Sequence, residues 1–159
     1  MNTGKYVFAQ IASFLPQRQF DTIVSKHNGN YRIRHFSCWN QMLCMMFGQL
    51  SSRESLSDLV LTINAHPGKL YHLGFGKSVS KTNLAKANEQ RSYLIYEEFA
   101  KLLIAEARKI CEPANENVFS FANAVYAFDS TTIDLCLNIF SWATFRKHKG
   151  AVKLHTQYD

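Results

Sequence analysis

The sequence predicts an α+β protein, in which a helical domain over residues 1–117 precedes a β domain over residues 118–159. Apolar residues recur at three- and four-residue steps through the first domain and at two-residue steps in the second. Between them, residues 111–117 are rich in proline, asparagine and glutamate, as is typical of a linker. A β-branched and aromatic run at 124–132, which contains Asp129, predicts the first strand.

Helical spacing predicts helices near residues 7–15, 16–27, 36–50, 56–65 and 95–110. In the clearest of them, the apolar stripe is Phe36, Trp39, Leu43, Met46, Phe47 and Leu50. Ser37 or His35 is expected to begin that helix, and Ser51 or Ser52 the next one. In the last helix the residues expected to be buried are Ile95, Phe99, Leu102, Leu103, Ala107 and Ile110.

Three strands are expected in the second domain, at residues 124–132, 133–139 and 151–158. The first is expected to end close to Asp129, and the basic run 146–150 to form a hairpin tip between the second and third. Three strands without a covering helix make a marginal sheet, so we expect this chain to be the front part of a longer fold.

Composition points to a partner with negative charge. The chain has 159 residues, is 47% hydrophobic and carries a formal net charge of +6, which fits nucleic acid. The four cysteines form no CxxC pair and stand in apolar segments, so buried free thiols are expected.

No apolar run approaches the roughly 20 residues of a membrane span, and a cytoplasmic protein without membrane contact is expected. The run Gly74–Ser78 lacks the first glycine of a phosphate loop, because position 71 is Tyr71.

Asp129 is the candidate catalytic and metal-binding residue. A strand holds a carboxylate rigidly, and phosphodiester chemistry by two metal ions needs several such carboxylates together. From the residues alone a turn is the alternative, because an Asp before Ser-Thr-Thr often bonds nearby amides. Asp134 could share the face of Asp129 across a hairpin, but we expect it to be an exposed partner for Lys153 or Arg146. Asp159 could be a second acid, but we expect an ordinary strand end there.

Several blocks of the sequence resemble bacterial insertion-sequence DDE transposases. YAFDSTTIDL at 126–135, FSWATFR at 140–146 and GAVKLH at 150–155 are similar to the start of their catalytic domain. WNQML at 39–43, SSRESL at 51–56 and SKTNLAKAN at 80–88 are similar to their N-terminal domain. The resemblance covers nearly the whole chain, in three spaced catalytic-domain blocks that stand in the family's order.

This resemblance implies that residues 118–159 are the first three strands of an incomplete RNase H-like domain. In that family three acidic residues bind two Mg²⁺ ions, and the enzyme cuts and joins phosphodiester bonds at the ends of the element. Asp129 matches the first acid, whereas no residue here matches the second Asp or the Glu, so this chain alone is expected to be inactive. The implied partner is double-stranded DNA at the terminal inverted repeats, with a possible homodimer in a transposition complex and a nucleoid-associated location.

DNA contacts are expected at one polar helix start and at the basic hairpin, namely at Ser80, Lys81, Thr82, Asn83, Lys86, Asn88, Arg91, Arg146, Lys147 and Lys149. The alternative for both segments is a solvated surface. Two other accounts of the whole chain stay open. One is a non-catalytic DNA-binding remnant or regulator that competes for element ends, and the other is an inert remnant that aggregates through its bare sheet.

Overall fold

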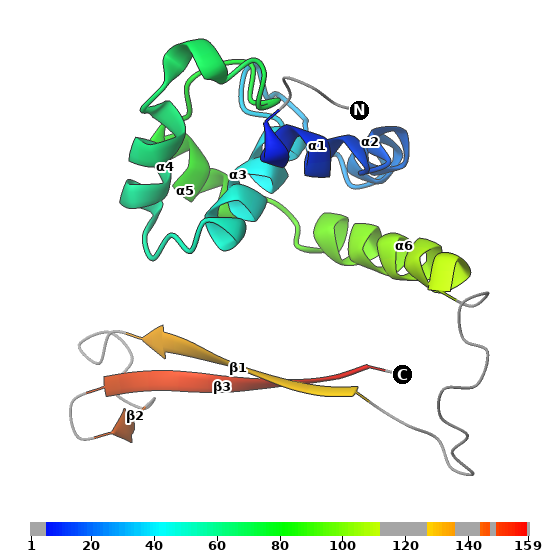
Figure 1. Cartoon of the computed structure of the whole chain (residues 1–159), viewed down its shortest axis with the longest axis vertical. Helices are drawn as coiled ribbons and strands as arrows, with labels where there is room; N and C mark the ends of the chain where they lie inside the picture. The colour runs from blue at the N-terminus through cyan, green and yellow to red at the C-terminus, as the bar shows by residue number, and fades with distance from the viewer. Residues whose placement is uncertain (1–5, 112–126, 136–143, 147–148, 159) are drawn as a thin grey trace. The chain divides into compact units, whose positions relative to one another are not determined.

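The computed structural model describes residues 6–111, 127–135, 144–146 and 149–158 (Figure 1). The chain divides into two compact units, residues 1–113 and 114–159, and each is described by itself. The predicted boundary between 117 and 118, and the linker residues after Cys111, lie outside the described residues.

The first unit is helical, as predicted. It contains α1 (Val7–Ser13), α2 (Gln17–Lys26), α3 (Cys38–Leu50), α4 (Leu56–Asn64), the short 3₁₀ helix η1 (Pro67–Lys69), α5 (Lys81–Gln90) and α6 (Leu94–Cys111). Among the described residues, no helix is long and apolar enough to cross a membrane.

The ends of α3 explain one correct and one wrong prediction. Ser37 begins α3, and its hydroxyl accepts a hydrogen bond from the Asn40 amide at 3.2 Å. The cap of α4 is Ser55 rather than Ser51 or Ser52. Those two residues instead end α3, because Ser52 has a left-handed φ of 52° and the amide of Arg53 turns back to the carbonyl of Gly48 at 2.9 Å.

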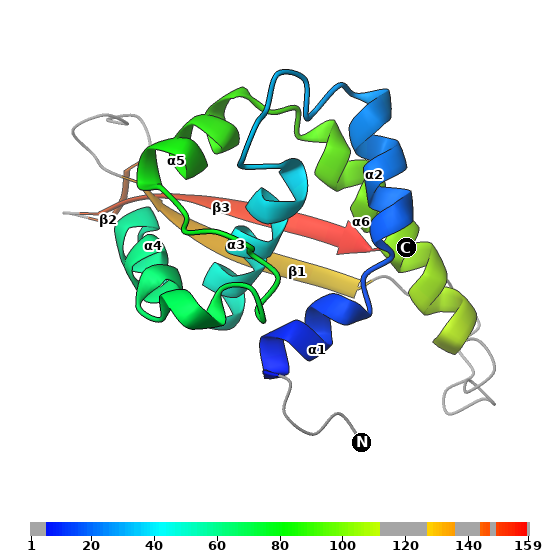
Figure 2. The same cartoon turned by 90° about the horizontal axis from the view of Figure 1, so that it is seen from above.

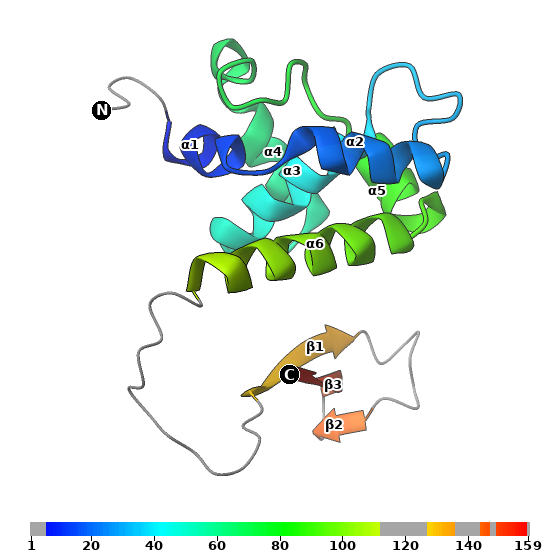
Figure 3. The ribbon, with the colours of Figure 1, turned by 90° about the vertical axis from the view of Figure 1, so that its right-hand side faces the viewer.

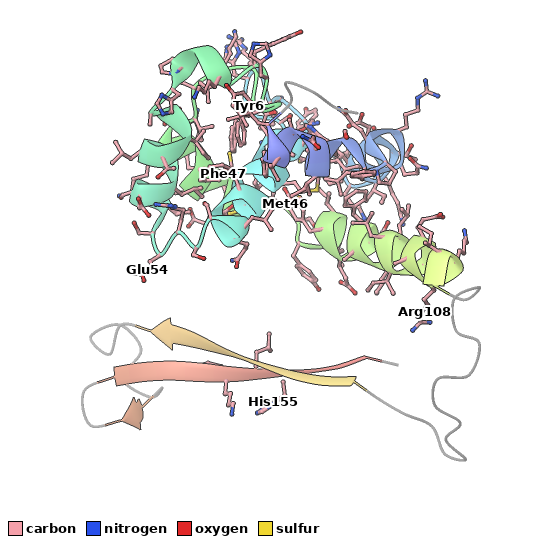
Figure 4. All side chains as sticks on the ribbon, viewed as in Figure 1. Tyr6, Met46, Phe47, Glu54, Arg108 and His155 are labelled. Atoms are coloured by element: carbon pink, nitrogen blue, oxygen red, sulfur yellow. The ribbon has the colours of Figure 1, made fainter. Side chains whose placement is uncertain are left out.

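Helix α3 is the centre of the first unit and contributes to two groups of buried side chains (Figures 1 and 2). On one side Leu43 and Cys44 join a cluster with residues of α1, α4, α5 and the η1 region. The ring of Phe8 lies edge-on to that of Phe47, with 5.3 Å between the ring centroids, and Figure 4 labels Phe47. On the other side Cys38 and Met42 pack with α2 and α6. Burial of these apolar side chains is the main force holding the unit together.

Helix α2 packs against the first half of α6 (Figure 3). Phe20 is fully buried between them and contacts the ring of Phe99 edge-on at 4.9 Å. An exposed clamp joins the same helices, since Glu98 accepts from Lys26 Nζ at 2.8 Å and approaches His27 Nε2 at 3.0 Å. Hydrogen bonds to the side chains of Lys26 and His27 lower the pKa of the Glu98 carboxyl.

The second half of α6 differs from the prediction. Ile95 and Phe99 are buried and Leu102 and Leu103 are half-buried, but Ala107 is exposed and Ile110 is 76% exposed. Helix α2 has 10 residues and α6 has 18, so α2 is too short to cover the whole apolar stripe.

The second unit contains β1 (Ala127–Leu135), β2 (Thr144–Arg146) and β3 (Lys149–Tyr158). All pairing is antiparallel and the strand order is β1-β3-β2, so β3 is central. The predicted break between strands at 132 and 133 is wrong, because β1 continues through Thr131 and Thr132 to Leu135. Threonine is β-branched and suits an extended backbone, and all nine residues of β1 have partners on β3. The hairpin predicted at 146–150 lies between β2 and β3, where Arg146 pairs with Lys149.

We expect Gly29→Ala to destabilise the first unit by about 1–3 kcal/mol, because neighbouring side chains leave no room for a Cβ at this position. A Cβ there would lie 2.5 Å from Cδ1 of Ile95 and 2.8 Å from Sγ of Cys38. Urea unfolding followed by circular dichroism measures the effect. Gly68→Ala is the matched control, since a Cβ at Gly68 meets nothing within 4 Å. Equal stability of the two variants would contradict this packing.

Candidate nucleic-acid interface

A groove of about 680 Å³ lies between the α2–α3 connection, residues 27–36, and the second half of α5 with the residues that follow it. We call it the basic groove. Figure 2 shows that connection running from α2 to α3 along the same side of the unit as α5. The lining residues are His27, Asn28, Gly29, Tyr31, Arg32, Ile33, Arg34, His35, Phe36, Asn83, Lys86, Ala87, Gln90, Arg91 and Ser92.

The charge of this lining is of one sign. Arg32, Arg34 and Lys86 are exposed, and no carboxylate of the described residues forms an ion pair with any of them. Neither aspartate nor glutamate lines the groove. A concave surface whose lining contains basic side chains and no carboxylate concentrates positive potential and attracts polyanions.

The connection is held in a defined conformation by its own backbone. Asn28 and Arg32 have left-handed φ angles of 51° and 56°. This region costs an arginine about 1–2 kcal/mol, because Cβ crowds the following carbonyl oxygen. The connection is tied to the helices through the amide of Gly29, which donates to Val24 O at 2.9 Å, and through Asn30 Oδ1, which accepts from the Cys38 amide at 2.8 Å.

Arg91 joins the two walls of the groove. Its Nη1 donates to the carbonyl oxygen of Ser37 and to Oε1 of Gln41, each at 2.9 Å, and its Nη2 donates to the carbonyl oxygen of Phe36. The guanidinium also lies over the Phe36 ring, 5.5 Å from its centroid. Arg91 thereby fixes the end of the connection to the residue that follows α5.

Gln41 completes this polar cluster inside the unit. Its side chain is 4% exposed; Oε1 accepts from the Tyr96 hydroxyl at 2.6 Å, and Nε2 donates to Oδ1 of Asn88 at 2.7 Å. Burial raises the pKa of Tyr96 and of the neighbouring Cys38 thiol, and Arg91 partly offsets both shifts. Both groups therefore stay protonated at neutral pH, as does Cys44, whose pKa burial raises to about 12. Cys38 and Cys44 are buried free thiols, as predicted for them.

The structure separates the residues predicted to contact DNA. Asn83, Lys86 and Arg91 line the groove. Ser80 caps α5 by accepting from the Asn83 amide, while Lys81 and Thr82 are exposed in the first turn and do not line the groove. Asn88 bonds to Gln41 instead. Arg146 and Lys149 are paired at the β2–β3 hairpin, and Lys147 lies outside the described residues.

Sequence reasoning missed the other wall of the groove. Helical spacing predicts one helix that ends near residue 27 and another that begins near residue 36, with no site between them, yet this stretch supplies the exposed cations Arg32 and Arg34. The available signal was the run Tyr-Arg-Ile-Arg-His at 31–35, where basic side chains alternate with an aromatic and an aliphatic one. Such interleaving is typical of nucleic-acid-binding surfaces.

A second cavity, of about 590 Å³, lies on the opposite side of Arg91 and is mainly apolar. Met42, Met45 and Met46 of α3 contribute to its wall, and Met46 is labelled in Figure 4. Arg91 lines both this cavity and the basic groove, whereas its partner Gln41 and Asn88 line only the apolar cavity of the two.

Asp129 stands within β1, opposite Thr156 of β3, and not at a strand end. Asp134 lies on the same strand opposite Ala151, and strand alternation puts positions 129 and 134 on opposite faces, so Asp134 cannot share the face of Asp129. Asp159 lies outside the described residues. In the described parts of the chain, no three His, Cys, Asp or Glu side chains gather to hold a metal ion.

Residues 3–76 match a family model described as a domain of unknown function, DUF4372, which is found in transposase-like proteins. The match contains the 27–36 wall of the groove and stops before α5. No curated protein and no solved structure matches the chain.

We expect Arg91→Lys to lower the free energy of unfolding by about 1.5–3 kcal/mol. Lysine keeps the charge but cannot donate to the carbonyls of Phe36 and Ser37 and to Gln41 at once, so buried acceptors lose their partners. Urea unfolding measures the change. Arg18→Lys, on the exposed side of α2, is the control and is expected to stay within about 0.5 kcal/mol of the parent. An equally small effect of Arg91→Lys would contradict the stabilising role given to the hydrogen bonds of Arg91.

Proposed function

We propose that this protein takes part in DNA transposition and that its helical unit binds the ends of an insertion sequence through the basic groove. The observation that supports this most directly is the acid-free lining, with Arg32, Arg34 and Lys86 exposed and without a carboxylate partner in the described part of the chain. A duplex carries one negative charge per about 1.7 Å of its axis, and cations that neutralise these phosphates release bound counterions.

The two walls of the groove suit different contacts. Arg32 and Arg34 on the connection can meet phosphate oxygens, which fixes the position of a duplex without reading its sequence. Helix α5 presents Asn83, Lys86 and Gln90 at three- and four-residue steps, on the side that lines the groove. Amide side chains can bond the N6 and N7 edge of adenine in the major groove, so α5 is the proposed source of sequence preference.

The wider function rests on the resemblance and on the family match. The DUF4372 model, found in transposase-like proteins, covers most of the helical unit, and Asp129 lies on a strand that follows it. We assign Asp129 as the first of the three acids of an RNase H-like catalytic domain on the resemblance alone. Mg²⁺ would be held by that complete set of acids in a longer protein, and this chain would contribute DNA binding.

We expect Lys86→Ala to weaken binding of a short duplex in proportion to one lost phosphate contact. The plot of log Kd against log salt should become less steep by about 1, because one fewer counterion is released. Fluorescence anisotropy of a labelled duplex between low and moderate salt gives both values, and EDTA is expected to change neither.

Lys101→Ala is the matched control, with the same loss of charge. Lys101 is exposed on α6, outside the groove, and its Nζ lies 2.5 Å from Glu97 Oε1. This variant is expected to keep the affinity and the salt slope of the parent. If both variants weakened binding equally, net charge rather than the groove would explain the affinity.

We expect Asp129→Ala, made at the matching position of a relative that carries the complete catalytic domain, to abolish strand cleavage while leaving DNA binding largely intact. The groove cations lie in the helical unit and do not depend on the carboxylate of β1. A gel assay of strand cleavage, run beside anisotropy binding, separates the two activities. Normal cleavage by the variant would remove Asp129 from the proposed catalytic set.

A further inference from the structure

Tyr31 is the residue of the basic groove whose chemistry phosphate binding does not use. Its side chain is 68% exposed although it belongs to a unit with two apolar clusters. In the described part of the chain no other aromatic ring pairs with it. The guanidinium of Arg32 lies over one side of the ring, 5.1 Å from its centroid.

The backbone on both sides of Tyr31 holds it in this exposed position. Asn28 and Arg32, with left-handed φ angles, bracket the residue, and the Tyr31 amide donates to Asn28 O at 3.0 Å. An arginine in this conformation is strained, and such strain tends to persist where a conformation serves binding. The neighbouring Gly29 and Asn30 are anchored on Val24 and Cys38. The ring is therefore presented on a braced loop, so little conformational freedom is lost on binding.

An aromatic ring beside cations that have no carboxylate partner in the described residues fits a nucleobase better than a phosphate. Phosphates need the cations only, whereas a flat ring binds the face of a base by stacking, and Arg beside it adds to that contact. Ile33, 43% exposed in the same lining, offers a further apolar contact. Inside a duplex the faces of the bases are covered by their neighbours. Away from the terminal base pairs, only an unpaired nucleotide offers a face to Tyr31.

We propose that the basic groove takes DNA with an unpaired segment, such as a frayed end or a single-stranded overhang, and that Tyr31 stacks on one of its bases. This inference rests on the proposed function, because it assigns to the same groove a class of DNA substrate. Arg32, Arg34 and Lys86 hold the backbone of the strand, and Tyr31 distinguishes an unpaired base from a paired one.

The test measures the affinity of the full 159-residue chain for three labelled probes of equal length. The probes are a blunt duplex, a duplex with a single-stranded overhang, and a single strand. Tyr31→Leu is expected to weaken binding of the two probes with unpaired bases about 5- to 100-fold, the usual range for one stacked base, and to leave the blunt duplex unchanged. Tyr31→Phe keeps the ring and is expected to restore parent affinity. Circular dichroism of each variant confirms that the unit is folded.

The outcomes separate the two proposals. If Lys86→Ala weakens every probe while Tyr31→Leu weakens none, the groove binds DNA and the stacking role of Tyr31 is overturned. Equal weakening of all three probes by Tyr31→Leu also overturns it, since a role in recognising unpaired bases requires the blunt duplex to be affected least. If the parent chain binds none of the probes, the proposed function fails together with this inference.

Discussion

The guanidinium of Arg91 sets the geometry of the basic groove, because Arg91 directly follows α5 and its side chain bonds the carbonyls of Phe36 and Ser37, where the other wall ends. It approaches the N-terminus of α3, which carries partial positive charge, and a cation there is unfavourable by itself. The carbonyls of Phe36 and Ser37 and the amide oxygen of Gln41 offset that cost with charge-assisted hydrogen bonds. Arg91 is thus a positioning residue, and its charge is engaged within the protein.

Ion pairs are distributed unevenly over the surface of the helical unit. Several carboxylates pair with cations away from the groove, as Glu97 does with Lys101 and Glu106 with Lys109 on α6, and Asp58 with Arg53 at α4. Arg32 and Arg34 of the connection and Lys86 of α5 have no such partners in the described residues. A concave surface concentrates the potential of such cations. Exposed ion pairs contribute little to stability, and in the described residues none of those found here involves Arg32, Arg34 or Lys86.

The sheet of the second unit places Asp129 on a backbone with a fixed register. Each residue of β1 has a partner on the central strand β3, so position 129 is set by the pairing rather than by a loop. A backbone of this kind gives a side chain a fixed point of attachment. The same register separates positions 129 and 134 onto opposite faces of the sheet.

Much of the fold follows from local chemistry that the sequence displays. Apolar periodicity predicted the helical unit and the strand-forming segments after it, and the hydroxyl of Ser37 predicted the start of α3. The predictions were wrong where the structure of a segment depends on other segments that pack against it. The exposure of Ile110 depends on the length of α2, the cap of α4 depends on how α3 reverses at Ser52, and the unbroken β1 depends on its pairing with β3. Periodicity describes one segment at a time and contains no information on what covers it.

The candidate site divides in the same way. By itself the sequence determined that the chain is basic, that a polar cluster stands at the start of α5 and that Asp129 lies in a strand-forming run. Only the tertiary structure decided which cations act together. It brought Arg32 and Arg34 beside Lys86, more than 50 residues later in the chain, and it turned Asn88 and Arg91 toward Gln41. The physical reason is that electrostatic potential depends on distance in space, which packing around α3 sets and spacing along the chain does not.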